Sequence, residues 1–94
     1  MYAVVRTYSG QGASEVFDLI EQRHEDVTDL LTGVPGFVNY AAVRSSDGGV
    51  TVTVCEDKAG TDESSRRAAE WIKGNASGTA SAPAITEGDT IIHI

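Results

Sequence analysis

One histidine of this sequence lies in a pattern that suits proton transfer. His24 follows Phe17 and Ile20 in a segment with helical spacing of apolar residues, and at 100° per residue it falls on the same stripe. A neutral imidazole there could act as a general base or orient a phenol-like ligand, because its ordinary pKa is near neutrality. The alternative is a histidine at the edge of the stripe that is bonded to a backbone carbonyl.

Four other side chains form a candidate ligand-binding set: Tyr8, Asn39, Tyr40 and Trp71. A mostly apolar pocket needs only a few polar groups to orient a ligand. Asn39 would cost about 1–3 kcal/mol if it were buried without a partner, so we expect it to bond to backbone, a partner chain or a ligand. Trp71 either covers a pocket with its indole or anchors a short helix in the core.

Neither a metal site nor a cofactor motif is predicted. Glu21 and His24 have the spacing of one half of a di-iron carboxylate site, but a second pair is missing and His93 is the only other histidine. Cys55 precedes Glu56-Asp57, whose charges disfavour a thiolate, so we expect a packed strand residue. No glycine-rich phosphate loop, nucleophile elbow or zinc spacing occurs in the sequence.

Length and charge limit the classes of protein that remain. Ninety-four residues predict a single domain, 1–94, and 14 acidic against 7 basic residues give a formal net charge of −7. Nucleic acid and anionic membranes are therefore poor partners. One cysteine allows no intrachain disulfide, and the N-terminus lacks a basic segment followed by an apolar run. We expect a cytoplasmic protein.

Hydrophobic periodicity predicts the elements that position these residues. Strands are expected at Tyr2–Tyr8, Phe37–Arg44 and Val50–Glu56, with a last strand at Thr90–Ile94 after a lead-in from Ala84 and a break at Glu87-Gly88-Asp89. One long helix is expected from Ser14 to Thr32, with an acidic outer face, and another from a cap at Thr61 to Lys73. The order is βαββαβ, a ferredoxin-like α+β fold in which both helices cover one face of a four-stranded antiparallel sheet.

The second face of that sheet is predicted to be apolar too. Val4 and Val5 point to opposite sides of the first strand, and the chain ends in Ile91-Ile92-His93-Ile94. A chain of this length has nothing left to cover that face, so we expect a homodimer that packs sheet on sheet. The small-residue segment from Asn75 to Ala84 is expected to be mobile or to reach the partner protomer.

Several segments carry a family resemblance: Val34-Pro35-Gly36-Phe37, the Ser45–Gly49 hairpin, Val52–Asp57, and Ala69-Glu70-Trp71-Ile72. With this layout the chain resembles the dimeric α/β-barrel superfamily, and within it the small antibiotic-biosynthesis-monooxygenase-like proteins. The resemblance implies a cleft between sheet and helices that holds a small, often aromatic molecule. Tyr2–Tyr8 lacks the asparagine of the haem-degrading branch, so no haem ligand is assigned.

The resemblance leaves two classes of function open. The first is a homodimer that binds a small aromatic or apolar metabolite and oxygenates it without metal or flavin, with His24 as base, Asn39 and Tyr40 holding a substrate oxygen, and Trp71 excluding water. The second is a non-catalytic dimer that binds a metabolite, or another protein through its acidic first helix.

Overall fold

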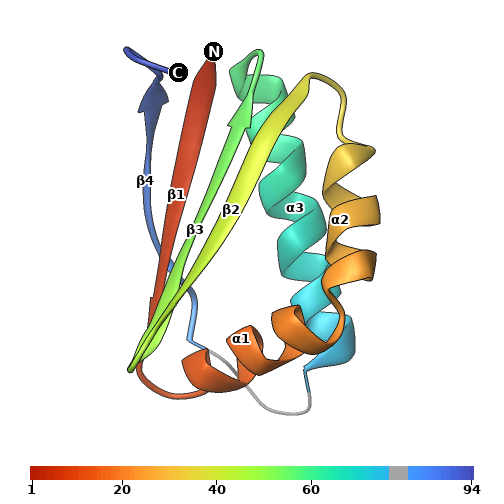
Figure 1. Cartoon of the computed structure of the whole chain (residues 1–94), viewed down its shortest axis with the longest axis vertical. Coiled ribbons are helices and arrows are strands. Elements are labelled where there is room, and N and C mark those ends of the chain that lie inside the picture. Colours follow the sequence, from red (N-terminus) through yellow and green to blue (C-terminus); the bar gives the residue numbers. More distant parts are fainter. Residues whose placement is uncertain (77–80) are drawn as a thin grey trace.

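The computed structural model describes residues 1–76 and 81–94. The elements follow in the order β1 (Tyr2–Ser9), α1 (Ala13–Gln22), α2 (His24–Thr32), β2 (Phe37–Ser45), β3 (Gly48–Cys55), α3 (Lys58–Asn75) and β4 (Ala84–Asp89). The strands form one antiparallel sheet in the order β2-β3-β1-β4. All helices lie on one side of it (Figure 1). The predicted ferredoxin-like α+β architecture is therefore confirmed.

The helix predicted over Ser14–Thr32 is two helices. Arg23 leaves helical geometry, with φ −119° and ψ 34°, and separates α1 from α2. The break lets α1 cross the hairpin end of the sheet while α2 runs beside α3 (Figure 1). An angle counted at 100° per residue holds only within an unbroken helix, so it cannot be carried across Arg23. Within α2, Val27 and Leu31 are the buried residues.

The helix α3 begins earlier than predicted. Asp57 is its cap, because the Oδ1 atom accepts a hydrogen bond from the backbone N of Gly60 at 3.1 Å. Thr61, the predicted cap, lies inside the helix with 1% of its surface exposed. Its hydroxyl donates to the carbonyl of Lys58 at 3.0 Å. The helix ends at Asn75, after the predicted Lys73.

The prediction for the last strand was wrong. The strand β4 runs straight through Glu87-Gly88-Asp89 and stops at Asp89, which pairs with Tyr2 at the start of β1. Beyond that point the neighbouring strand has ended, and one backbone bond remains, from Thr90 N to Met1 O at 2.9 Å. Three isoleucines beyond β4 are consequently exposed: Ile91, Ile92 and Ile94.

The core lies between the sheet and α1. Phe17 is 2% exposed, and its ring meets the edge of Tyr8 with centroids 5.8 Å apart and an interplanar angle of 77°. Gly49 of β3 makes room for that ring, because a Cβ there would lie 2.7 Å from Phe17 Cε2 and Cζ. Gly48 beside it has φ +136°, a backbone conformation that favours glycine.

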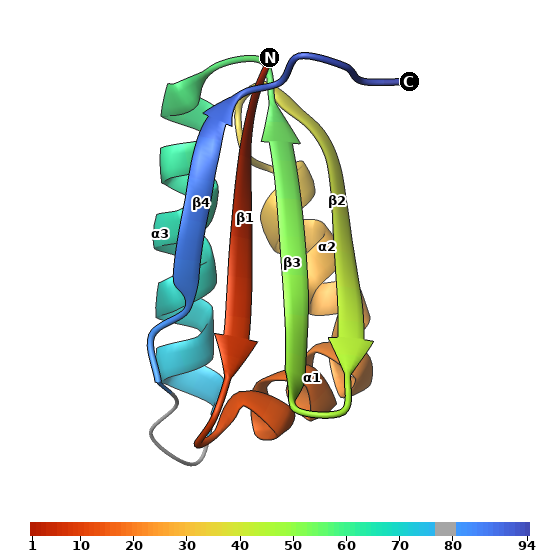
Figure 2. The same cartoon turned by 90° about the vertical axis from the view of Figure 1, so that its left-hand side faces the viewer.

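None of the described helices lies over the other face of the sheet. Figure 2 looks onto this face, and among the described residues only those after β4 cross it, along one end. We call it the open face; it carries the alternate side chains of the strands, Ala3, Val5, Thr7, Asn39, Ala41, Val43, Val50, Val52, Val54, Ala84, Thr86 and Gly88. Most of them are apolar, as the sequence predicted.

The segment from Asn75 to Ala84 is described in part. Residues 77–80, on which the expected mobility or partner contact rests, lie outside the described residues. At the far end of the segment, the backbone N of Ser81 donates to the carbonyl of Gln11 at 3.2 Å. This bond holds the chain that enters β4 against the loop between β1 and α1.

Charged side chains on α3 make the stability of the fold depend on acid pH. Hydrogen bonds from Arg66 and Arg67 hold the pKa of the Glu63 carboxyl at about 2, below its ordinary 4.5. Arg67 also donates to the carbonyl of Leu30 at 3.2 Å and so joins α3 to α2. Because the unfolded chain takes up this proton near its ordinary pKa, the carboxylate stabilises the fold above pH 4.5 and loses that effect as the pH falls toward 2.

We expect Glu63→Gln to remove this part of the acid sensitivity. Urea unfolding of both proteins should give a stability difference in favour of the natural chain above pH 4.5 that shrinks as the pH falls toward 2. A difference that stays constant over this range would contradict the assignment.

Candidate functional site

A buried arginine lies at the centre of the helix-covered face. Arg6 is 3% exposed and lies on β1 between Val4 and Tyr8, on the same side of the sheet. Its Nη1 donates to the hydroxyl of Thr53 at 3.0 Å and contacts that of Thr51 at 3.5 Å. Its Nη2 donates to the hydroxyls of Ser64 and Ser65 on α3 at 3.0 and 2.9 Å.

These partners are hydroxyl groups, which carry no charge. Among the residues that the structure describes, no salt bridge reaches the Arg6 guanidinium. Burial consequently lowers the pKa of Arg6 from its ordinary value, against the attraction of nearby Tyr8, Tyr40 and Cys55. A buried cation that lacks a counterion is costly. An anion placed beside it would gain more than at the surface.

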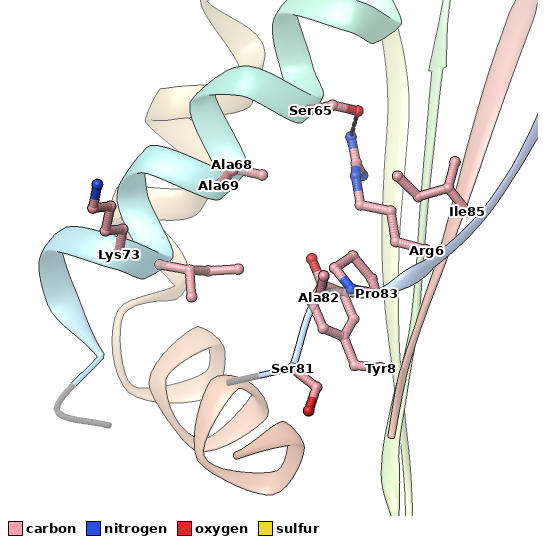
Figure 3. A pocket seen from close by; sticks show the side chains of 11 residues that line it. Arg6, Tyr8, Ser65, Ala68, Ala69, Lys73, Ser81, Ala82, Pro83 and Ile85 are labelled. Carbon is pink, nitrogen blue, oxygen red and sulfur yellow. Dashed lines mark hydrogen bonds between the residues drawn. The ribbon is translucent and has the colours of Figure 1, made fainter. Parts of the chain in front are cut away.

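A cavity of ≈ 560 Å³ opens beside Arg6. It lies between α3, β1, the start of β4 and the segment 81–83 (Figure 3). The lining residues are Arg6, Tyr8, Ser65, Ala68, Ala69, Ile72, Lys73, Ser81, Ala82, Pro83 and Ile85. The set contains two basic residues and no acidic one, although the whole chain has twice as many acidic as basic residues. We call this space the α3 cavity.

A second, smaller space of ≈ 20 Å³ lies deeper between the helices and the sheet. Arg6 and Tyr8 line both spaces, and Tyr40 and Trp71 join them at the inner one. Burial raises the pKa of both tyrosines, while the charge of Arg6 opposes that rise. Three of the predicted ligand-binding residues therefore line the same inner space as Arg6.

Solved structures share this architecture. A monooxygenase from the gene ActVA-Orf6 of Streptomyces coelicolor, in complex with nanaomycin D, matches with a TM-score of 0.69 and 21% identity over 99% of this chain and 89% of that chain. A haem-degrading protein of Mycobacterium tuberculosis, with two haems in its active site, matches with 0.63 and 16% over 99% and 97%. The chain shares its ferredoxin-like α+β fold with these structures.

A third structure with this fold is an ethyl tert-butyl ether d family protein from Bacillus halodurans, with a TM-score of 0.61 and 15% identity over 97% of this chain and 99% of that chain. No family profile matches the chain, and no curated protein matches it by sequence. At these identities the likeness establishes the fold, and function must be argued from the site itself.

Two predicted site residues lie elsewhere in the fold. His24 is exposed at the first turn of α2, and its Nδ1 lies 3.3 Å from the carbonyl of Glu21. Its predicted position on the stripe that faces the sheet was wrong: His24 is the first residue of α2 and is exposed, whereas Leu31, one heptad further along the same helix, is buried. Asn39 is exposed on the open face, where its Nδ2 lies 2.7 Å from His93 Nε2. Neither residue lines the α3 cavity or the space beneath it.

Cys55 lies at the end of β3, fully buried as predicted. Burial raises the pKa of its thiol, and the charge of Asp57 raises it further. Thr51 and Thr53 share its face, and their hydroxyls accept hydrogen bonds from Arg6. Within residues 1–76 and 81–94, no group of three His, Cys, Asp or Glu side chains is placed to hold a metal ion.

Sequence reasoning missed Arg6, the residue that organises the site. Its signal was a cation on the face of a strand otherwise occupied by Val4 and Tyr8, opposite the threonines of a neighbouring strand. The cavity wall formed by Ala68, Ala69 and Ile72 could not be predicted from the sequence for another reason. Small and apolar side chains on a helix look the same in sequence whether they line a cavity or pack.

No helix within the described part of the chain has both the length and the apolar character needed to cross a membrane.

Proposed function

We propose that this protein is a cytoplasmic homodimer that binds a small aromatic metabolite in the α3 cavity. The observation that supports this most strongly is a cavity of ≈ 560 Å³ with mostly apolar walls and one buried cationic group. Known ligand pockets of about 300–1,000 Å³ combine apolar walls with a few polar groups that fix orientation. A molecule with one to three fused rings suits this space.

Each wall of the cavity has a role in this proposal. The ring system packs between Ala68 of α3 on one side and Pro83 and Ile85 on the other (Figure 3). Ile72 of α3 also lines the cavity. Its polar end points inward to Arg6, which lies at the floor. Tyr40 and Trp71, which line the deeper space, support that floor from behind.

The homodimer in this proposal uses the open face. Val5 and Val52 lie at its middle and are paired neighbours on β1 and β3. At the rim, Val43 is 59% exposed, and Ile91 beyond β4 is 93% exposed. A second copy packed on the same face would cover both valines and give these exposed apolar side chains a partner surface.

The reaction proposed for this cavity is oxygenation of the bound ring without metal or flavin. A phenol that has lost its proton can give an electron to O₂, and the two radicals then join through a new carbon–oxygen bond. Loss of water from the resulting hydroperoxide leaves a quinone. For 1-naphthol, the carbon–hydrogen bond opposite the hydroxyl breaks, one oxygen atom enters 1,4-naphthoquinone, and the other leaves in water.

A non-catalytic binding protein is the second candidate, and one observation favours it. Among the described residues, neither a histidine nor a carboxylate lines the α3 cavity. The cavity therefore lacks the side chains that usually act as general bases near neutral pH. Turnover would therefore depend on the ligand ionising under the influence of Arg6 or in solution before it binds. Binding without turnover is the outcome expected of this candidate.

Filling the cavity tests the proposal. We expect Ala69→Trp to weaken binding of 1-naphthol at least tenfold, because the indole occupies the space between α3 and Ile85. The matched control is Ala59→Trp on the first turn of α3, where the residue is exposed and lies outside the cavity. Titration calorimetry measures binding, and an oxygen electrode measures O₂ uptake.

The possible outcomes separate the candidates. Naphthol-dependent O₂ uptake that Ala69→Trp removes supports the oxygenase, and binding without uptake supports the binding protein. If the natural chain does not bind 1-naphthol, or if both tryptophan variants bind it equally, the α3 cavity is not the ligand site.

A further inference from the structure

We propose that Arg6 makes the α3 cavity selective for aromatic molecules that carry an ionised oxygen, which is either a phenolate or a carboxylate. This inference rests on the proposed function, because it names the class of ligand for that cavity. The geometry that supports it is a guanidinium that is 3% exposed, lines the cavity, and is held by hydroxyl groups alone among the described residues.

The hydroxyls around Arg6 fix its position without neutralising it. The hydroxyl of Ser64 donates its own proton to the carbonyl of Thr61 at 2.7 Å, so its oxygen remains free to accept from Arg6. Thr53 and Ser65 hold the two ends of the guanidinium from opposite elements, β3 and α3. The cation is thus held in one orientation and keeps its full charge for a ligand.

The surroundings of the cavity strengthen the selectivity for anions. The other charged residue in its described lining is Lys73, which is also basic and lies at the outer rim (Figure 3). The acidic side chains of the chain lie elsewhere, for example on the outer sides of α1 and α2 at Glu15, Asp18, Glu21, Glu25 and Asp29. A neutral ligand would leave Arg6 buried and uncompensated, whereas an ionised oxygen would offset the cost of burying it.

The competing explanation is that Arg6 only joins the sheet to α3. Its four hydroxyl partners come from β3 and α3, so it does link these elements. A purely structural role predicts that variants change stability and leave the preference between ligands unchanged. A role in selectivity predicts that the preference itself changes. The test must therefore compare ligands of equal shape and different charge.

Two pairs of ligands make that comparison. 1-Naphthoate and 1-naphthamide have the same ring and nearly the same shape, and differ in charge. 4-Nitrophenol and 4-nitroanisole form the phenolate arm, because bound nitrophenolate is recognised by its visible absorbance. We expect the natural chain to bind naphthoate at least about tenfold more tightly than the amide, and to lower the pKa of bound nitrophenol by about one unit.

The variants then assign the effect to one residue. Arg6→Met keeps an unbranched side chain without charge, and we expect the naphthoate preference and the nitrophenol shift to disappear. Arg6→Lys keeps the charge and guards against a Met variant that does not fold; we expect part of the preference to remain. Ser65→Ala removes one hydrogen bond to Arg6 and keeps the guanidinium, so the preference should persist even where stability falls.

Salt separates the buried site from binding at surface lysines. Attraction to an exposed lysine weakens as salt is added, whereas a buried cation is screened little. The net charge of −7 repels an anion at long range, and salt screens that repulsion. Naphthoate affinity should therefore stay constant or rise with salt, and a fall would contradict binding at Arg6.

Failure of this inference differs from failure of the proposed function. If neither naphthoate nor naphthamide nor nitroanisole binds, the cavity is not a ligand site and both proposals fall. If all three bind, but naphthamide binds as tightly as naphthoate, the α3 cavity remains the ligand site and the proposed selectivity for anions is overturned. The selectivity of Arg6 is also overturned if Arg6→Met folds and keeps the full preference.

Discussion

Phe17→Ala lowers the free energy of unfolding by about 3–5 kcal/mol, the range for a large buried aromatic side chain. Phe17 of α1 is 2% exposed, and its ring packs against Tyr8 and the hairpin glycine Gly49. The total free energy of unfolding of a small domain is about 5–15 kcal/mol, so this variant should be only marginally stable. Urea unfolding followed by circular dichroism measures the loss, and a change below about 1 kcal/mol would contradict this packing.

Two further variants locate the effect. Phe17→Leu keeps an apolar side chain in place and should cost much less than the alanine variant. Gly49→Ala brings a methyl group to 2.7 Å from the Phe17 ring and also against the carbonyl of Val43, so it should destabilise the fold by itself. Combined with Phe17→Leu, its cost should be smaller than in the natural chain, because the two sites share one space.

This packing also bears on the ligand site. The ring of Tyr8 touches Phe17 on one side and lines the α3 cavity on the other. Loss of the phenylalanine ring frees Tyr8 to move, and a mobile tyrosine no longer defines one wall of the cavity. We therefore expect Phe17→Ala to bind 1-naphthol more weakly than Phe17→Leu under conditions in which both are folded.

The strands were predictable where alternation and turn chemistry agreed. The first strand, the turn at Pro35-Gly36 and the alternating segment from Val50 to Cys55 all contain local signals of the structure they form. The break at Arg23 has no such signal, because apolar spacing continues through it. The end of β4 is set by where β1 begins, and this is a pairing between distant segments that no local pattern contains.

The candidate site was predicted in part for a similar reason. Tyr8 and Tyr40 reach the same inner space, as does Trp71. Asn39 could not join Tyr40, because adjacent residues of a strand point to opposite faces, and this alternation is readable in the sequence. Arg6 was overlooked since its partners are distant in the chain: Thr53 is 47 residues away and Ser65 is 59. Only the folded sheet and α3 bring them together.

Val5→Glu converts the proposed homodimer into monomers at micromolar concentration. Val5 lies on β1 between Val52 of β3 and Thr86 of β4, in the middle of the open face. Two-fold symmetry would bury two new carboxylates in one interface, so we expect the dissociation constant of the dimer to rise at least about a hundredfold. Sedimentation velocity over a dilution series measures it.

Gln22→Glu is the matched control, because it adds the same charge on the exposed outer side of α1. It should leave the dimer intact if the open face is the interface, and a dimer that resists Val5→Glu but dissociates with Gln22→Glu would place the interface on the helices instead. Val5 is only half-buried in a single copy, and none of the described helices lies over the open face, so Val5→Glu should still fold. The α3 cavity lies on the opposite side of the sheet, and we therefore expect the monomeric variant to bind 1-naphthol with nearly unchanged affinity.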